Sequence, residues 1–174
     1  VDVGCGCGVF GFYLLHALAR QGRHLRRILF IDPHQPSLAA LARTLTRHRQ
    51  QLPMLDSAQF SADSLLAPLL QQGEKAELIY ANLPQTPGPG NFRLDRCGGN
   101  DGAELLCTLL AQLPDALAAN GMAFILHISL ANPSRIRDCL QQHGLQATIV
   151  AEQQRHALWA DYETLQPGLG SYLQ

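Results

Sequence analysis

The chain has 174 residues, 16% charged residues and a formal net charge of −1, the composition of an ordinary globular domain without a signature of disorder. The near-neutral charge gives no global reason to expect a nucleic-acid partner, and local groups of arginines are interpreted as solvated helix ends. The five cysteines show no spacing typical of a metal site or a disulfide framework, so free thiols and a cytoplasmic location are expected. No apolar run approaches the length of a membrane span, and no membrane partner is expected.

Strand and helix patterns alternate along the chain to about residue 150. A short apolar strand at 1–3 enters a glycine-rich turn and then a helix at 9–18. The next predicted elements are a strand at 27–32, a helix at 36–49, a strand at 54–60, a short helix at 65–71, a strand at 77–81, a helix at 102–119 that Pro114 bends or breaks, a turn at 120–121, a strand at 122–129 and a helix at 133–143. Two last β segments, 146–153 and 156–165, are expected to form a hairpin.

This order predicts an α/β fold: a doubly wound, Rossmann-like, mostly parallel sheet of seven strands that ends in an antiparallel C-terminal hairpin. Ligands bind such sheets at the carboxyl ends of the strands, near the switch in strand order. The loops after the first four strands are therefore expected to meet at one site. We expect residues 1–174 to form a single domain cut from a longer polypeptide, without an N-terminal substrate-recognition region, since the chain begins on a core strand.

The turn after the first strand reads Gly4-Cys5-Gly6-Cys7-Gly8. Glycines let the backbone approach a ligand closely and adopt positive φ, and the start of the following helix offers free N–H groups. The sequence therefore predicts a ligand cradle. The Gly-x-Gly-x-Gly spacing is distinguished from the Gly-x-Gly-x-x-Gly of dinucleotide folds, which disfavours an NAD-linked dehydrogenase.

Two acidic residues follow predicted strands. Asp32 ends the second strand, where a carboxylate can accept both hydroxyls of a ribose; the alternative is a turn or helix-capping role before Pro33. Asp63 and Ser64 follow the third strand, where Ser61, Asp63 or Ser64 could cap the short helix. Asp2 lies two residues before the first glycine and could serve as a local hydrogen-bond acceptor for the turn.

The fourth strand runs into Asn82-Leu83-Pro84-Gln85. With Asp2-Val3-Gly4-Cys5-Gly6-Cys7-Gly8, Asp32, Asp63 and the run Gly98-Gly99-Asn100-Asp101-Gly102-Ala103-Glu104-Leu105, this segment resembles the class I S-adenosylmethionine (AdoMet)-dependent methyltransferases. Among them it is similar to the HemK-type glutamine methyltransferases that modify release factors. The resemblance covers about residues 1–130 and implies a class I methyltransferase fold.

The resemblance implies AdoMet as the cofactor and no metal. In this family an acid at the place of Asp63 binds the adenine amino group, and the next backbone N–H reaches a ring nitrogen. Asp2 can accept from the methionine ammonium. The implied cofactor-binding set is Asp2, Gly4, Cys5, Gly6, Gly8, Asp32, Pro33, Asp63, Ser64 and Asn82.

The resemblance also implies that Asn82 and Pro84 position the methyl acceptor, with Gln85 contacting it. The reaction is a direct displacement on an activated methyl group, so placement and desolvation do most of the work. Leu83 and Gln85 replace a proline and an aromatic residue of the family motif. Leu83 can still present its carbonyl, whereas Gln85 offers hydrogen bonds instead of a stacking plane.

The expected acceptor is a nitrogen, either a glutamine amide of a protein or a small-molecule amine. Three alternatives stay open: an RNA or DNA N-methyltransferase, an S-methyltransferase of a small amino acid, and a catalytically silent scaffold. Nucleic acid is the less favoured partner because the chain carries little net charge.

Overall fold

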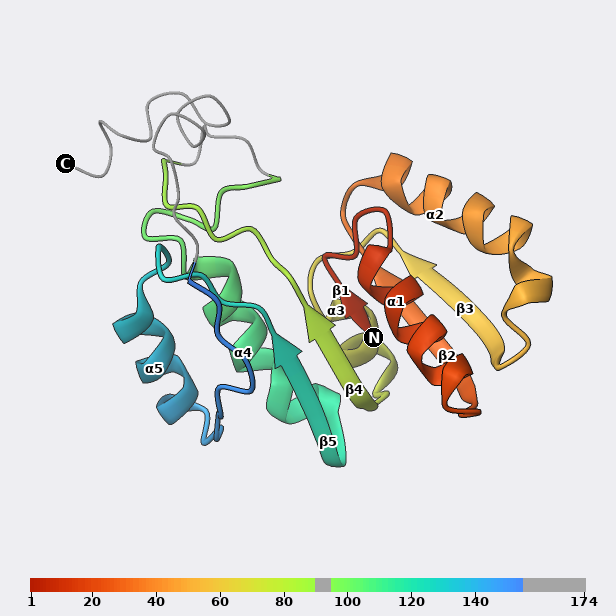
Figure 1. Ribbon diagram of the computed structural model, residues 1–174. Coiled ribbons are helices and arrows are strands. Elements are labelled where there is room, and N and C mark those ends of the chain that lie inside the picture. Colours follow the sequence, from red (N-terminus) through yellow and green to blue (C-terminus); the bar gives the residue numbers. More distant parts are fainter. Residues whose placement is uncertain (90–94, 155–174) are drawn as a thin grey trace. The chain divides into compact units, whose positions relative to one another are not determined.

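The computed structural model describes residues 1–89 and 95–154 (Figure 1). These residues belong to two compact units. The first, which we call the sheet unit, comprises residues 1–82 and 115–126. The second unit comprises residues 83–114 and the chain from residue 127 onwards.

The sheet unit is built on five parallel strands in the order β3-β2-β1-β4-β5. The strands are β1 (Asp2–Val3), β2 (Leu25–Ile31), β3 (Leu55–Ser61), β4 (Ala76–Ala81) and β5 (Leu117–Ile125). The short β1 pairs on one side with β2 and on the other with β4, so the strand order reverses beside it. This reversal is the place where open α/β sheets bind ligands. The predicted α/β class with a parallel sheet is confirmed, and the sheet is compatible with a Rossmann-like fold.

Apolar spacing explains how the helices of the sheet unit pack. In α2 (Gln35–Arg47), Leu38, Leu41 and Leu45 recur at helical spacing and are buried. They join residues of α1 (Val9–Arg20), β2 and β3 in one core cluster on one face of the sheet. Figure 1 shows α1 and α2 on this face and the short α3 (Ala67–Gln72) behind the sheet. A 3₁₀ turn, η1 (Arg49–Gln51), follows α2.

The second unit contains α5 (Pro133–Gln142) and most of α4 (Glu104–Ala116). Pro114 lies inside α4, which continues for two residues beyond it. At the start of α5, the Asn132 side chain accepts a hydrogen bond from the Arg135 amide at 3.1 Å. This is the preferred chemistry of a helix N-cap.

Two expectations about strands are wrong. Residues 146–153 form no strand in the described part of the chain, and residues 156–165 lie outside it, so neither seven strands nor an antiparallel hairpin is found. Ile149 and Val150 are 80% and 75% exposed. β-branched residues favour strands only where they pack against neighbours, and these two meet no such surface among the residues that the structure describes.

The turn expected at residues 120–121 lies instead inside β5, which begins earlier than predicted and ends at Ile125. Ala76 pairs with Leu117 but Leu78 pairs with Met122, so several residues of β5 are accommodated as an irregularity. Asn120 has a φ of 63° there. The turn-forming residues therefore produce a bulge within the strand rather than its start.

Candidate functional site

The glycine turn lies at the carboxyl end of β1. Gly4, Gly6 and Gly8 have φ values of 66°, 52° and 80°, in the left-handed region that glycine adopts without strain. A Cβ at Gly8 would lie 2.3 Å from Leu41 Cδ1, so Gly8 allows the turn to approach α2. A Cβ at Gly6 would meet nothing within 4 Å. The turn is thus closed toward the core at Gly8 and open to a ligand at Gly6.

Asp32 joins the end of β2 to this turn. Its Oδ2 accepts a hydrogen bond from the Gly6 amide at 2.7 Å, and its Oδ1 accepts one from the His34 amide at 2.8 Å across the exposed Pro33. The second bond is the local turn that the sequence allowed as an alternative. The carboxylate remains partly exposed beside the open side of the turn, where it can receive hydroxyl donors.

Asp2 is 3% exposed and lies beneath the turn. Its Oδ2 accepts a hydrogen bond from the Gly11 amide at 3.1 Å, which ties β1 to the first turn of α1. Burial raises the pKa of Asp2 to about 6, with the Asp32 carboxylate contributing in the same direction. The site therefore contains a carboxylate that changes charge near neutral pH.

Gly11 is a site residue that the sequence reasoning missed. A Cβ there would lie 2.4 Å from Phe30 Cε1 and 3.1 Å from Asp2 Oδ2, so Gly11 permits the close approach of α1 to β2. The spacing Gly6-x-Gly8-x-x-Gly11 is that of the dinucleotide fingerprint, in which the third glycine has this packing role. The glycine spacing alone does not disfavour a dinucleotide, and the sequence already contained this signal.

The two cysteines of the turn lie in different environments. Cys5 belongs to the core cluster, and burial raises the pKa of its thiol to about 12. Cys7 is exposed. The Cys5 side chain faces the core, and its backbone N–H donates to the Ile31 carbonyl at 3.1 Å, so its role in cofactor binding stays a prediction.

Asp63 and Ser64 follow β3. The Ser61 hydroxyl donates a hydrogen bond to the Asp63 carboxylate. The start of α3 has no side-chain cap, so the capping role considered for Asp63 and Ser64 is not observed. Both side chains are exposed at the carboxyl end of the strand.

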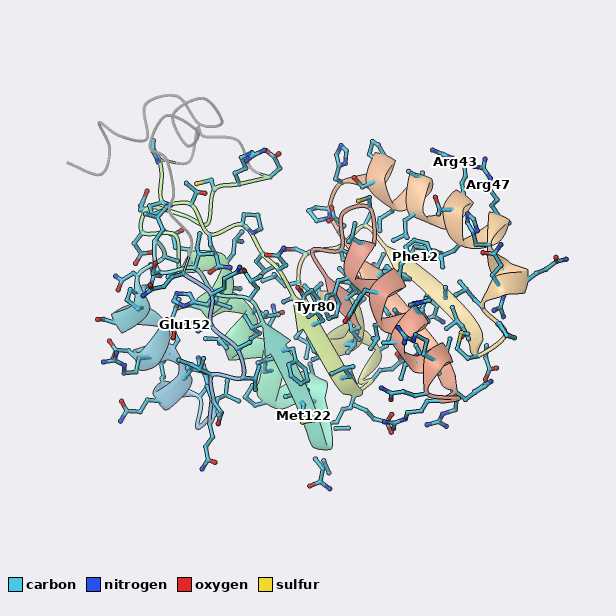
Figure 2. All side chains as sticks on the ribbon, in the orientation of Figure 1. Phe12, Arg43, Arg47, Tyr80, Met122 and Glu152 are labelled. Carbon is cyan, nitrogen blue, oxygen red and sulfur yellow. The ribbon has the colours of Figure 1, made fainter. Side chains whose placement is uncertain are left out.

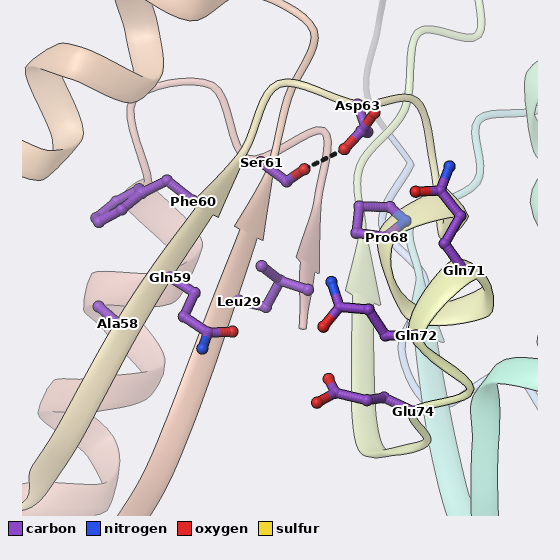
Figure 3. Close-up of a pocket in the computed structure, with 10 residues that line it drawn as sticks. All are labelled: Leu29, Ala58, Gln59, Phe60, Ser61, Asp63, Pro68, Gln71, Gln72 and Glu74. Carbon is purple, nitrogen blue, oxygen red and sulfur yellow. Dashed lines mark hydrogen bonds between the residues drawn. The ribbon is translucent and has the colours of Figure 1, made fainter.

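A hollow of about 480 Å³ lies between β3 and α3, with Asp63 at its rim (Figure 3). Gln59, Gln72 and Glu74 make its lining polar. None of the residues that line it comes from the glycine turn. We therefore place the candidate site at the turn, on its geometry, rather than in this hollow.

Asn82 follows β4, whose carboxyl end lies beside that of β1. Its side chain is exposed and forms no hydrogen bond with any residue of the described ranges. Two residues earlier, the Tyr80 ring stacks on Phe10 of α1 at an interplanar angle of 5°. The ends of β1, β2 and β4 thus bring together the glycine turn, Asp32 and Asn82.

Pro84 and Gln85 belong to the second unit. Gln85 is only 4% exposed. Its Nε2 donates to the Leu83 carbonyl at 3.3 Å, and its Oε1 accepts from the Ile128 amide at 3.0 Å. Gln85 therefore holds the loop internally, and its contact with a methyl acceptor stays a prediction.

The glycines of the run at 98–102 pack against this loop backbone to backbone. A Cβ at Gly98 would lie 2.6 Å from the Pro84 carbonyl oxygen, and one at Gly102 would lie 2.4 Å from that of Gln85. Asp101 accepts from the Ala103 amide at 3.1 Å. Glycine is therefore needed at these two positions, because a side chain there would prevent residues 98–102 from packing directly on the backbone of residues 84–85.

No protein-family model matches the chain, and none of the curated proteins is significantly similar to it. No group of three or more His, Cys, Asp or Glu side chains that could hold a metal is found among the residues the structure describes. Within those same residues, no helix is long and apolar enough to cross a membrane.

Proposed function

We propose that this chain is an AdoMet-dependent methyltransferase that transfers a methyl group to a nitrogen atom. The observation that carries the proposal is the left-handed glycine turn beside the strand-order reversal, open at Gly6 and with the Asp32 carboxylate on its amide. A nucleoside with an amino-acid tail fits this arrangement, since the start of α1 offers backbone N–H groups for a carboxylate and Asp32 offers a side-chain carboxylate for ribose hydroxyls.

The cofactor residues divide by chemistry. The amides of Cys7 and of the start of α1 would bind the methionine carboxylate, because the other amides of the turn already donate to Ile31, Asp32 or the turn itself. Asp32 would bind the ribose, and Asp63 with the Ser64 amide the adenine. AdoMet itself would supply a methyl group already activated on a sulfonium. No nucleophile or metal of the protein is then needed, and the task of the chain is to align the acceptor and exclude water.

Asn82 is the residue that can form a hydrogen bond with the methyl acceptor. Its side-chain oxygen has no partner within the described part of the chain, whereas the Leu83 carbonyl already accepts from Gln85. We therefore assign to Asn82 the hydrogen bond that orients the acceptor nitrogen, and to Pro84 and Gln85 the shape of the loop. A glutamine amide of a protein or a small amine would suit this arrangement; a nucleic-acid base, the sulfur of a small amino acid and a silent scaffold remain as alternatives.

A dinucleotide such as NAD is the second candidate ligand. The Gly6-x-Gly8-x-x-Gly11 spacing and the tight packing of Gly11 on Phe30 favour it. Asp32 also follows at about the 20-residue distance typical of the ribose-binding acid in dinucleotide folds. Binding of the pyrophosphate would then occupy the start of α1.

Calorimetric titration of the chain with AdoMet, its demethylated product and NAD tests the proposal. Micromolar binding of AdoMet without NAD binding supports the methyltransferase, and NAD binding alone refutes it. The matched variants are Gly6→Ala and Gly22→Ala: both glycines have positive φ, of 52° and 62°, and at both a Cβ meets nothing within 4 Å. Each substitution costs about 1 kcal/mol of backbone strain, but only Gly6→Ala is expected to weaken AdoMet binding, by tenfold or more.

The role of Asn82 has a separate test. Asn82→Ala is expected to still bind AdoMet but to transfer the methyl group at least a hundredfold more slowly, once an acceptor is found by screening protein amides and small amines. Unchanged turnover by the variant would remove Asn82 from the mechanism.

A further inference from the structure

The cationic residues of the chain are strongly segregated. Residues 3–55 contain seven arginines and a single acidic residue, Asp32, although the whole chain has a formal net charge of −1. This segment includes α1, β2, α2 and η1. The chain as a whole is therefore nearly neutral, but residues 3–55 are markedly basic.

The fold gathers most of these arginines at one edge of the sheet. Because β2 and β3 are parallel neighbours, with Leu25 opposite Leu55, the connections that lead into them lie side by side at the amino ends of the strands. Two contacts join the connections: His24 Nε2 lies 3.2 Å from Asp56 Oδ1, and an Arg49 guanidinium nitrogen donates to the Asp56 carbonyl at 2.9 Å. We call this the amino-edge surface; it comprises Arg20, Arg23, His24, Arg26, Arg47 and Arg49.

Most of the amino-edge arginines carry uncompensated charge. Arg20, Arg23, Arg26 and Arg47 are exposed, and none forms an ion pair or side-chain hydrogen bond with another described residue. Figure 2 shows Arg47 and its neighbour Arg43 projecting from α2. Arg27 differs, because Glu74 accepts two hydrogen bonds from its guanidinium at 2.9 and 2.7 Å.

Helix ends explain only part of this arrangement. Arg20 and Arg47 lie in the last turns of α1 and α2, where a cation stabilises the helix dipole. Arg23 and Arg26 lie beyond the helix, in the connection and at the start of β2, and have no such role. Clustered arginines repel one another in the free protein, and their planar guanidinium groups are suited to bind phosphate through paired hydrogen bonds.

We propose that the amino-edge surface binds the phosphate backbone of a nucleic acid, without reading its sequence. Within the sheet unit this surface lies at the edge opposite the glycine turn, which is at the carboxyl ends of the strands. Binding there does not depend on methyl transfer, so the two proposals can fail separately.

The test is fluorescence anisotropy of a labelled 20-nucleotide oligouridine titrated with the full chain from 25 to 200 mM KCl. The variant Arg23→Ala/Arg26→Ala removes two positive charges; its control, Arg137→Glu, changes the net charge equally at an exposed arginine of α5. Single-stranded nucleic acid contributes about 0.7 to the salt slope per phosphate contact. The double variant is therefore expected to bind at least tenfold more weakly at 50 mM KCl, with a slope smaller by about 1.4, while the control keeps the wild-type slope.

Three results would overturn the proposal: no binding of oligouridine at 25 mM KCl, equal losses in the double variant and the control, or equally tight binding of a polyglutamate of the same charge. The last result would assign the surface to an acidic protein. Circular-dichroism melting checks that the double variant is folded, which is expected because neither side chain has a partner among the described residues.

Discussion

Asp2 allows a quantitative test of the site, because its carboxylate is buried where its charge is costly. Asp2→Asn keeps the size of the side chain and an oxygen that accepts from the Gly11 amide, but removes the ionisable group. Burial raises the pKa of Asp2 from 3.8 to about 6 in the folded chain. The folded state thus binds the proton more tightly than the unfolded state does.

The sign of the pH dependence follows from this difference. Both states are protonated well below pH 4, and both are ionised well above pH 6; between these limits the wild-type chain loses stability as the pH rises. A difference of about two pKa units corresponds to about 3 kcal/mol. The free energy of unfolding of Asp2→Asn, relative to wild type, is therefore expected to rise by about 2 kcal/mol between pH 4 and pH 7.

Urea unfolding of both proteins at several pH values measures this difference. Asp138→Asn, which removes an exposed carboxylate on α5, is the matched control and should show no comparable trend. A difference between Asp2→Asn and wild type that does not change with pH would refute the reasoning, because it would mean that the Asp2 carboxylate is hydrated in the folded chain.

Three further substitutions or treatments test individual contacts. Gly11→Ala places a Cβ 2.4 Å from the buried Phe30 ring and is expected to lower the free energy of unfolding in urea by about 1–3 kcal/mol; an unchanged midpoint would contradict the packing. Gln85→Ala leaves a backbone amide and a carbonyl without their side-chain partner and is expected to cost about 1–3 kcal/mol. Gln85→Glu keeps the acceptor for Ile128 but places a buried carboxylate against the Leu83 carbonyl, so it should cost at least as much at neutral pH. Thiol labelling followed by mass spectrometry should modify the exposed Cys7 and leave the buried Cys5 intact until the chain unfolds, and bound AdoMet should slow the labelling of Cys7.

The parts of the fold that the sequence predicted are those in which local signals agree with burial. In α2, the leucines at helical spacing are also the residues buried against the sheet. The sequence periodicity and the packing therefore indicate the same helix and the same buried face. Ile149 and Val150 show the opposite case: their strand propensity is real, but no neighbouring strand is provided for them among the described residues. At Asn120, turn-forming chemistry was correctly recognised, but only the pairing of β5 with β4 decides that it makes a bulge.

The candidate site was predictable where chemistry depends on backbone conformation. The absence of a Cβ allows the positive φ observed at Gly4, Gly6 and Gly8, and the place of Asp32 after β2 indicated its position at the site. The burial of Gln85 could not be predicted, because its partner Ile128 is distant in the sequence. A glutamine in a loop suggests a surface group that contacts ligands; here both ends of its amide are used to hold the backbone.

The charge of Asp2 also bears on which ligand the turn binds. AdoMet carries an ammonium and a sulfonium, whereas the pyrophosphate of NAD carries two negative charges. The Asp2 carboxylate, ionised above about pH 6, lies beneath the turn and interacts electrostatically with Asp32. The Asp2 carboxylate therefore attracts AdoMet and repels NAD.

Affinity for AdoMet is expected to rise as the pH increases through 6 in wild type but not in Asp2→Asn. Calorimetry of the variant should show weaker AdoMet binding and stronger NAD binding than wild type. An Asp2→Asn variant that bound both ligands as wild type does would show that this carboxylate acts only on folding.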